Sequence, residues 1–292
     1  MNFTIAKNGN EAICSTVGGE LVSFKSGGRE YVWYGLPEHW SGQAPCLFPV
    51  VCRAKDDIIV VDGAEYPMPK HGVARKVEYK PVEVTPDSVR FRLCDSEETR
   101  KHYPYGFVLD ITHKVTERGF STFYTVENTN DSEMSFCIGG HPGFNCPLND
   151  GESFEDYSLI FDDASGAVAH ITEPEGGYMD PDMPALDIIR DNEIKLKYSD
   201  FDNDAIIVED LPVKKVRLVN RKTGHGILFE FDSFDAIGFW TPIKQSSPFI
   251  CLEPWNGLPG SLGETSELCK KKYAKTIAPG ECFSTGYTVT VI

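Results

Sequence analysis

A histidine framed by glycines and a proline is the first residue of this chain with a chemical role to consider. His141 lies in the segment GGHPGF of residues 139–144, directly after residues 135–138. Glycine and proline turn the backbone and let it approach a ligand closely, so we expect the imidazole ring to project into a cleft, where it could exchange protons. The alternative is a structural histidine in a turn, because short motifs are weak evidence on their own.

A carboxylate at the end of an apolar run is the second candidate. Glu253 lies in FICLEPWNG, residues 249–257, where an apolar strand is expected to end and to break at Pro254. A half-buried carboxylate beside an aromatic residue has a tunable pKa and is a candidate general base. The alternative is a Glu at a strand end that forms an ion pair with an Arg.

Basic and aromatic side chains elsewhere could hold a ligand. Arg53, and His71 and Arg75 in the segment KHGVAR of residues 70–75, are cationic or imidazole groups that suit sugar hydroxyls or a phosphate. Trp240 follows an apolar strand and could offer its face to a sugar ring. The alternatives are a solvated basic loop and a core tryptophan.

Several common chemistries have no support in the sequence. It contains no G-x-G-x-x-G, G-x-x-x-x-G-K-[ST], H-E-x-x-H or G-x-S-x-G pattern, which argues against dinucleotide, nucleotide-phosphate, zincin and serine-hydrolase sites. The spacing of Asp200, Asp202 and Asp204 imitates a calcium loop, but Ala205 and Leu211 occupy the positions that need Gly and a bidentate Glu. We therefore expect no metal site.

The charge of the chain limits its partners. It has 28 basic and 44 acidic residues, a net charge of −16, which disfavours nucleic acids and anionic membrane surfaces. The amino terminus lacks the features of a secretory signal, no segment is apolar enough to span a membrane, and the nine cysteines form no C-x-x-C pair. These features predict a cytoplasmic protein with reduced, mostly buried cysteines.

Alternation of apolar and polar residues predicts an all-β fold. Residues 89–94 alternate strictly, and two pairs of segments, 108–116 with 120–127 and 215–220 with 226–231, flank short turns as in β-hairpins. The best helical candidates are residues 96–102 and 264–273, and the acidic, proline-rich residues 150–184 are expected to form a surface loop. Residues 1–292 therefore read as one domain, a large antiparallel β-sandwich with a few short helices.

Taken together and in this order, these segments resemble the aldose 1-epimerase (galactose mutarotase-like) family, in particular a bacterial branch related to the protein of lactose and tagatose operons. The resemblance runs nearly from end to end. The segments that carry it are residues 13–24, 49–53, 70–75, 103–105, 139–144, 201–205, 238–241, 252–255 and 277–281.

The resemblance implies a large β-sandwich whose concave face holds the sugar, with a histidine acid and a glutamate base. On this sequence the acid is His141 and the base Glu253. It also implies that His71 and Arg53 contact sugar hydroxyls or the ring-oxygen region, and that Asp204 is the substrate-binding aspartate, with Asp202 as the other alignment. Cys52 stands where many relatives of this branch have Gly.

Anomer interconversion suits these residue types. A base removes the proton of the C1 hydroxyl and an acid protonates the ring oxygen, so two proton-transfer groups suffice without a metal or cofactor. The reference pKa values of Glu and His, about 4.3 and 6.5, allow a carboxylate base and an imidazolium acid near neutral pH. We expect a neighbouring carboxylate such as Asp204 to keep His141 protonated.

Three other functions remain open at this point. Residues 71–75 are also similar to hexose-6-phosphate 1-epimerases, in which arginines take the phosphate, as Arg53 and Arg75 could do here. A non-catalytic carbohydrate-binding protein would stack sugar on Trp240 and Trp255. A glycoside hydrolase ranks last, because it usually needs two carboxylates. The expected partner is a free aldose or a sugar phosphate, and the chain could be a monomer or a homodimer.

Overall fold

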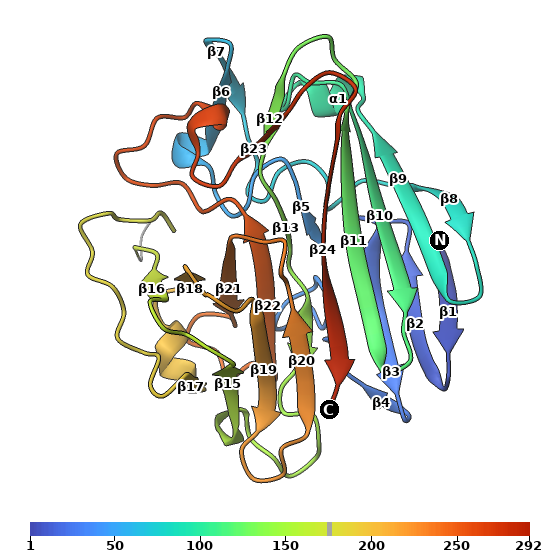
Figure 1. Cartoon of the computed structure of the whole chain (residues 1–292), viewed down its shortest axis with the longest axis vertical. Helices are drawn as coiled ribbons and strands as arrows, with labels where there is room; N and C mark the ends of the chain where they lie inside the picture. Colours follow the sequence, from blue (N-terminus) through green and yellow to red (C-terminus); the bar gives the residue numbers. More distant parts are fainter. Residues whose placement is uncertain (174–176) are drawn as a thin grey trace.

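Two large antiparallel β-sheets organise the computed structural model, which describes residues 1–173 and 177–292 (Figure 1). The nine-stranded sheet contains, in spatial order, β17 (Glu193–Lys195), β15 (Tyr157–Phe161), β19 (Lys215–Asn220), β20 (Gly226–Glu230), β24 (Cys282–Val291), β11 (Gly119–Asn128), β10 (Phe107–Val115), β9 (Ser88–Cys94) and β8 (Lys80–Val84). The seven-stranded sheet contains β16 (Val168–Ile171), β18 (Ile206–Glu209), β21 (Ala236–Trp240), β22 (Phe249–Asn256), β13 (Ile138–Gly140) and β5 (Cys46–Leu47), with β14 (Gly143–Asn145) also paired to β22.

Smaller elements surround the two sheets. The amino-terminal four-stranded sheet, blue in Figure 1, contains β1 (Asn2–Lys7), β2 (Asn10–Ser15), β3 (Glu20–Ser26) and β4 (Arg29–Glu30), and two strand pairs are β6 (Ile58–Val61) with β7 (Ala64–Pro67) and β12 (Met134–Phe136) with β23 (Lys275–Ile277). The helices are α1 (Glu97–Arg100) and four 3-10 turns, η1 (Lys55–Asp57), η2 (Phe154–Asp156), η3 (Tyr198–Phe201) and η4 (Leu268–Lys270). The predicted all-β antiparallel sandwich is confirmed. In the described parts of the chain, no helix is both long and apolar enough to cross a membrane.

Aromatic side chains between the two large sheets form much of the core. Phe144 of β14 packs against Phe229 of β20 with ring centroids 6.0 Å apart, and Phe161 of β15 packs against Phe239 of β21 at 6.1 Å. All eight residues of β22 are buried, whereas β9 alternates between buried and partly exposed positions as its sequence predicts. One face of the seven-stranded sheet therefore packs in the core, and side chains on its other face can line a binding site.

Both predicted hairpins are confirmed. β10 pairs with β11 from Phe107–Asn128 to Val115–Phe120, and β19 pairs with β20 from Lys215–Glu230 to Val219–Gly226. The turn residues between alternating segments were sufficient to predict these local pairings, because a short turn fixes the register of its two strands.

The helix predictions are only half right. Residues 96–102 contain the shorter helix α1 (Glu97–Arg100). At its start the Ser96 side chain accepts a hydrogen bond from the backbone N–H of Thr99, and the Thr99 hydroxyl oxygen accepts one from the backbone N–H of Ser96. Residues 264–273 do not form a helix and contain only the 3-10 turn η4. Of the lysines of this segment, Lys270 and Lys271 form ion pairs with Glu267 and Glu264 of the same segment, and Lys272 forms a tertiary ion pair with Glu209 of β18.

Two expectations about strands were wrong. Residues 150–184 are not simply a surface loop, because they contain β15, a buried strand of the nine-stranded sheet, and β16 at the edge of the other; residues 174–176 of this stretch lie outside the described residues. β22 does not break at Pro254. Pro254 lies where β22 passes from pairing with β14 to pairing with β13, so its missing N–H interrupts no pairing on that side.

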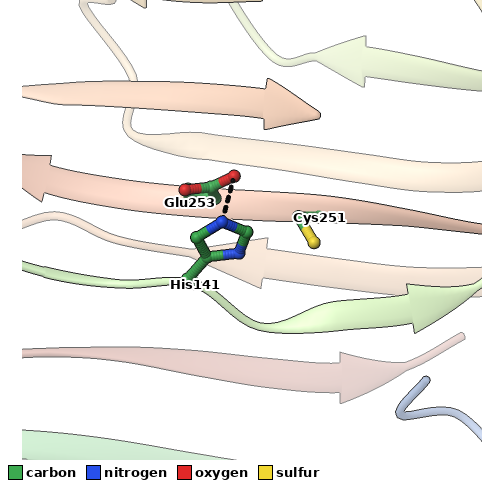
Figure 2. A group of neighbouring side chains, drawn as sticks. All are labelled: His141, Cys251 and Glu253. Carbon is green, nitrogen blue, oxygen red and sulfur yellow. Dashed lines mark ion pairs between the residues drawn. The ribbon is translucent and has the colours of Figure 1, made fainter. Parts of the chain in front are cut away.

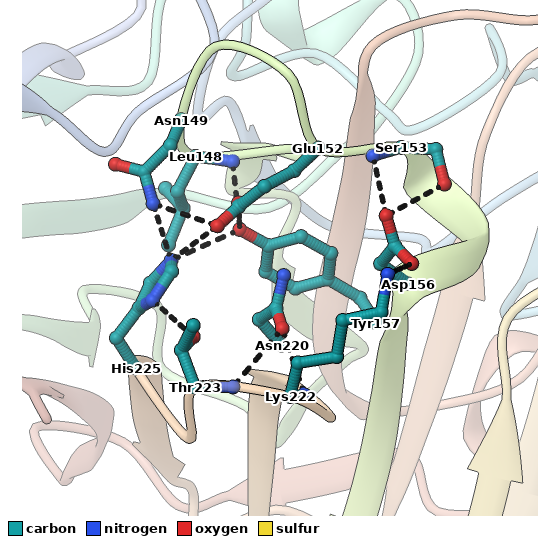
Figure 3. Close-up of polar contacts among 10 residues, drawn as sticks. All are labelled: Leu148, Asn149, Glu152, Ser153, Asp156, Tyr157, Asn220, Lys222, Thr223 and His225. Atoms are coloured by element: carbon teal, nitrogen blue, oxygen red, sulfur yellow. Dashed lines mark hydrogen bonds and ion pairs between the residues drawn. The ribbon is translucent and has the colours of Figure 1, made fainter.

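A polar cluster joins the segment before β15 to the β19–β20 turn (Figure 3). The Tyr157 hydroxyl donates to Glu152 and accepts from the backbone N–H of Leu148 at 2.9 Å. His225 lies 3.5 Å from Glu152 and contacts Asn149 at 2.8 Å. These contacts connect the segment before β15 to the β19–β20 turn at one end of the nine-stranded sheet.

Candidate active site

The sheet register places His141 opposite Glu253. Gly139 of β13 pairs with Trp255, and Gly143 of β14 pairs with Cys251, both on β22. His141 lies midway in the link between β13 and β14, so continuing this antiparallel register brings it to Glu253. Side chains at directly opposed positions share one face of a sheet and meet at short range.

The two side chains are in direct contact. His141 Nε2 lies 3.2 Å from Glu253 Oε1, and the exposed fractions of the two residues are only 6% and 2% (Figure 2). Glu253 thus contacts an imidazole, whereas the alternative considered from the sequence was an ion pair with an Arg. A proton donor and a proton acceptor therefore lie side by side and shielded from water.

A cavity of about 640 Å³ opens over this pair. Its lining includes all seven residues predicted from the sequence: Arg53, His71, Arg75, His141, Asp204, Trp240 and Glu253. Asp204 lines it but Asp202 does not, which favours the first of the two alignments. The remaining lining residues are Trp40, Cys52, Asp57, Lys70, Thr172, Gly177, Ala205, Ile207, Trp255 and Pro259. The structure thus brings the predicted residues together, although their roles stay predictions.

The floor of the cavity follows from one row of residues across the sheet. Ile207 of β18 is opposite Gly238 of β21, and Gly238 is opposite Glu253. A Cβ atom at Gly238 would lie 2.4 Å from the Trp255 ring, so only glycine leaves room for this indole in its place on the floor.

His71 is held in a defined tautomer by its neighbour in the cavity wall. Its ring nitrogen Nδ1 accepts a hydrogen bond from the backbone N–H of Cys52 at 3.1 Å. The backbone N–H of His71 in turn donates to the carbonyl of Cys52 at 2.7 Å. The neutral ring therefore carries its proton on Nε2. Burial lowers the pKa of His71 well below its usual value, and His141 and Lys70 nearby act in the same direction. Cys52 adopts φ +51°, a left-handed conformation that favours glycine.

Tryptophan side chains enclose His141. Trp40 stacks on the imidazole with ring centroids 4.8 Å apart and an interplanar angle of 26°, and Trp240 approaches its edge at 5.6 Å. Sequence reasoning missed Trp40, which lies in an irregular segment before β5. The only signal was an isolated tryptophan among Gly, Pro and polar residues, a composition in which a core position is not expected.

Burial sets the protonation of the central pair. It lowers the pKa of His141, since an imidazolium loses its hydration, and raises the pKa of Glu253 well above its usual value, with the negative charge of Asp204 as a second cause. The expectation of a standing imidazolium kept charged by Asp204 is therefore wrong. Asp204 acts on Glu253, and the carboxylate in contact with His141 is Glu253 itself.

Acidic neighbours compensate the arginines at the cavity. Arg53 forms a two-point contact with Asp57, with Nε 2.6 Å from Oδ1 and Nη2 bonded to Oδ2. Burial lowers the pKa of Arg75, and the charge of Glu20 partly restores it. The cavity wall carries three basic side chains, Arg53, Lys70 and Arg75, and three carboxyl groups, Asp57, Asp204 and Glu253.

One group of side chains at this site could also hold a metal ion. The ligand atoms of His141, Cys251 and Glu253 all lie within 4.8 Å of one another, and all three residues are buried.

Comparison with known proteins identifies the family. The family model described as aldose 1-epimerase matches residues 1–267 of the 292 residues. The chain belongs to the aldose 1-epimerase family. Its curated relatives include the plasmid-encoded protein LacX of Lactococcus lactis subsp. lactis, 35% identical over 284 residues that cover 95% of each chain. The resemblance inferred from the sequence, including the branch, is confirmed.

Solved structures of this family share the whole fold. A galactose mutarotase related enzyme from Lactobacillus acidophilus is 30% identical, with a TM-score of 0.93 over 100% of this chain and 97% of the other. A galactose mutarotase-like protein from Lactobacillus casei is 27% identical, with a TM-score of 0.94 and full coverage of both chains. A putative aldose 1-epimerase from Escherichia coli, 15% identical with a TM-score of 0.79 over 100% of this chain and 99% of the other, supports the fold alone.

Proposed function

We propose that this member of the aldose 1-epimerase family is a mutarotase that interconverts the α and β anomers of a free hexose. The observation that carries the proposal is the 3.2 Å contact between His141 Nε2 and Glu253 Oε1 in a sugar-sized cavity. Acid/base groups in water-shielded contact are what this reaction needs, and each contributes about 10²–10⁴ in rate.

The proposed reaction starts from the imidazolium–carboxylate form of the pair, which is reached from the neutral form by transfer of one proton from Glu253 to His141. Glu253 then takes the proton of the C1 hydroxyl while the Nε2–H of the His141 imidazolium donates its proton to the ring oxygen. The bond between C1 and the ring oxygen breaks, and the open-chain aldehyde forms. After rotation about the C1–C2 bond, His141 takes the proton back from the C5 hydroxyl as that oxygen attacks the other face of C1. Glu253 then returns its proton to the new C1 hydroxyl, so both residues end as they began.

The rest of the cavity suits a polar ring. The Nε2–H of neutral His71 is a fixed donor for a sugar oxygen, and Asp204 can accept hydrogen bonds from sugar hydroxyls. Trp240 offers an aromatic face to the C–H side of a pyranose. These assignments give His71, Asp204 and Trp240 binding roles, together with Arg53 and Arg75 at the wall.

The charge balance of the cavity favours a free aldose over a hexose 6-phosphate. A phosphate clamp requires an Arg fork that is available for two hydrogen bonds. The Arg53 fork already binds Asp57, and Arg75 has Glu20 as its counter-charge. A dianionic phosphate would therefore have to compete with the carboxyl groups that already face both arginines.

Polarimetry tests the proposal. Freshly dissolved α-D-galactose and α-D-glucose should equilibrate faster with the wild-type protein, and His141→Asn or Glu253→Gln should remove the acceleration while sugar binding, measured by calorimetry, persists. Exchange NMR on the 6-phosphates should show weaker acceleration than on the free sugars.

A matched control lies on the same sheet. His170 Nε2 contacts Glu209 Oε1 at 3.4 Å, and Glu209 is buried, but neither residue lines this cavity. His170→Asn should leave mutarotation unchanged. Acceleration of none of the sugars, together with measurable binding, would contradict the proposal and favour a non-catalytic carbohydrate-binding protein.

A further inference from the structure

A thiol lies beside the acid/base pair, and the proposed reaction does not use it. Cys251 and Glu253 are two residues apart on β22, so their side chains point to the same face of the sheet, where His141 meets them (Figure 2). Cys251 is fully buried and packs with Trp33 and Phe249. Three different ligand types thus converge within 4.8 Å.

We propose that His141, Cys251 and Glu253 form a binding site for a thiophilic divalent cation such as Zn²⁺, and that the bound ion inhibits the enzyme. Imidazole nitrogen, thiolate sulfur and carboxylate oxygen are the ligands of zinc, which is bound in open sites by three protein groups and one exchangeable ligand. Occupancy removes both proton-transfer groups from the reaction. The inhibition rests on the proposed mutarotase function, whereas the binding does not.

The distances fit such an ion after a small adjustment. Zinc bonds of about 2.0–2.3 Å in a tetrahedron place ligand atoms about 3.3–3.8 Å apart. His141 Nε2 and Glu253 Oε1 are already 3.2 Å apart, and Cys251 Sγ, which lies within 4.8 Å of an imidazole nitrogen and of a carboxylate oxygen, needs to move by about an ångström. Two of the three ligands, His141 and Glu253, line the cavity, so water or a sugar hydroxyl in the cavity could provide the fourth ligand.

The ligand set also selects the kind of metal. A thiolate favours Zn²⁺ or Co²⁺, whereas Mg²⁺ and Ca²⁺ require oxygen ligands. When the bond between Sγ and the metal forms, the Cys251 thiol loses its proton to the solvent, and so does the His141–Glu253 pair. No redox change and no further reactant is needed.

Cobalt titration of the full chain tests the binding directly. Co²⁺ bound to a thiolate gives a charge-transfer absorption band, so wild-type protein should develop this band with one equivalent of Co²⁺, and Zn²⁺ should displace it. Cys251→Ala should remove the band. It should also weaken metal binding at least as much as the loss of a group that hydrogen-bonds to a metal ligand does, which is about 10–100-fold. Cys52→Ala removes the other thiol of the cavity and should keep the band. His141→Asn is a second variant that should lose it.

Activity gives an independent readout. Zn²⁺ should inhibit wild-type mutarotation competitively with sugar, a chelator should restore it, and Cys251→Ala should turn over normally in the presence of Zn²⁺. Absence of the cobalt band in the wild type, or its persistence in Cys251→Ala and His141→Asn, would overturn the metal site. A cobalt band in a protein that accelerates no sugar would instead refute the mutarotase function and leave the metal site standing.

Discussion

Replacing Glu253 by Gln should lower activity and raise stability at the same time. Gln keeps the shape of the side chain but cannot take the proton of the C1 hydroxyl, so kcat should fall by about 10²–10⁴-fold, the usual contribution of one acid/base group. The charged form of Glu253 is disfavoured because the residue is only 2% exposed and Asp204 is near, so its pKa is raised. A neutral amide avoids that cost.

The sign of the stability effect follows from proton linkage. A carboxyl group whose folded pKa is raised contributes stability that is fully present below its unfolded pKa of about 4.5 and is lost as the pH rises toward the folded value. Gln does not titrate. Over that interval the unfolding equilibrium constant of wild type should therefore increase about tenfold per pH unit relative to that of Glu253→Gln.

The pair with His141 does not change this difference. Removal of the carboxyl group subtracts one titrating site from the folded and unfolded states alike, and burial disfavours the charged form of His141 in both proteins. Urea denaturation at several pH values above 5, combined with polarimetry, measures both effects. If Glu253→Gln loses stability together with activity, Glu253 has a structural role and the argument from burial is wrong.

Three further perturbations test other parts of the structure. Asp204→Asn should shift the limb of the pH–rate profile that belongs to Glu253 to lower pH, because Asp204 raises the pKa of Glu253. The control is Asp202→Asn, which changes an exposed residue outside the cavity and should leave this limb in place. Gly238→Ala should cost about 1–3 kcal/mol and raise KM, because its Cβ would lie 2.4 Å from the Trp255 ring; unchanged Tm and KM would contradict this packing. His113 is buried and its pKa is lowered to about 4, so it contributes stability that is present above pH 6.5 and is lost as the pH falls toward 4. His113→Gln should reduce the change in the free energy of unfolding over this pH range, measured with urea, by about 3 kcal/mol. An equal pH dependence in both proteins would refute the assignment.

The sequence predicted local features of the fold better than its long-range contacts. Hairpins such as β10–β11 follow from alternation and a short turn, because both determinants lie in one segment. β15 lies in an acidic, proline-rich stretch that we expected to be a loop, and its place in the nine-stranded sheet depends on pairing with β19, whose residues follow their partners by 55 to 63 positions. Residues 264–273 have an ambiguous pattern, and the segment makes contacts with distant parts of the chain in place of a helix, such as the ion pair of Lys272 with Glu209 and the hydrogen bond from the backbone N–H of Val60 to the carbonyl of Ser266.

The same limit applies to the site. His141 and Glu253 were predicted as separate candidates, each from its own flanking residues, but their contact depends on the register of β13 and β14 on β22, which no local pattern encodes. Trp40 was missed for this reason. Its stacking on His141 depends on the path of an irregular segment that is fixed by distant contacts, such as the hydrogen bond of the neighbouring His39 with Ser247 at 3.0 Å.

The opposite pKa shifts of His141 and Glu253 decide which proton transfers of the proposed reaction are favoured. The ion pair of imidazolium and carboxylate and the neutral pair of imidazole and carboxylic acid hold the same single proton and differ only in its position. Ring opening moves one proton from His141 to the sugar and another from the sugar to Glu253, so it converts the first form into the second. Since burial lowers the pKa of His141 and raises that of Glu253, it favours the state reached when the ring opens. Ring opening from the ion pair is therefore favoured by burial, whereas the ion pair itself must first form from the neutral pair that burial favours at rest, and the whole cycle has no net uptake or release of protons.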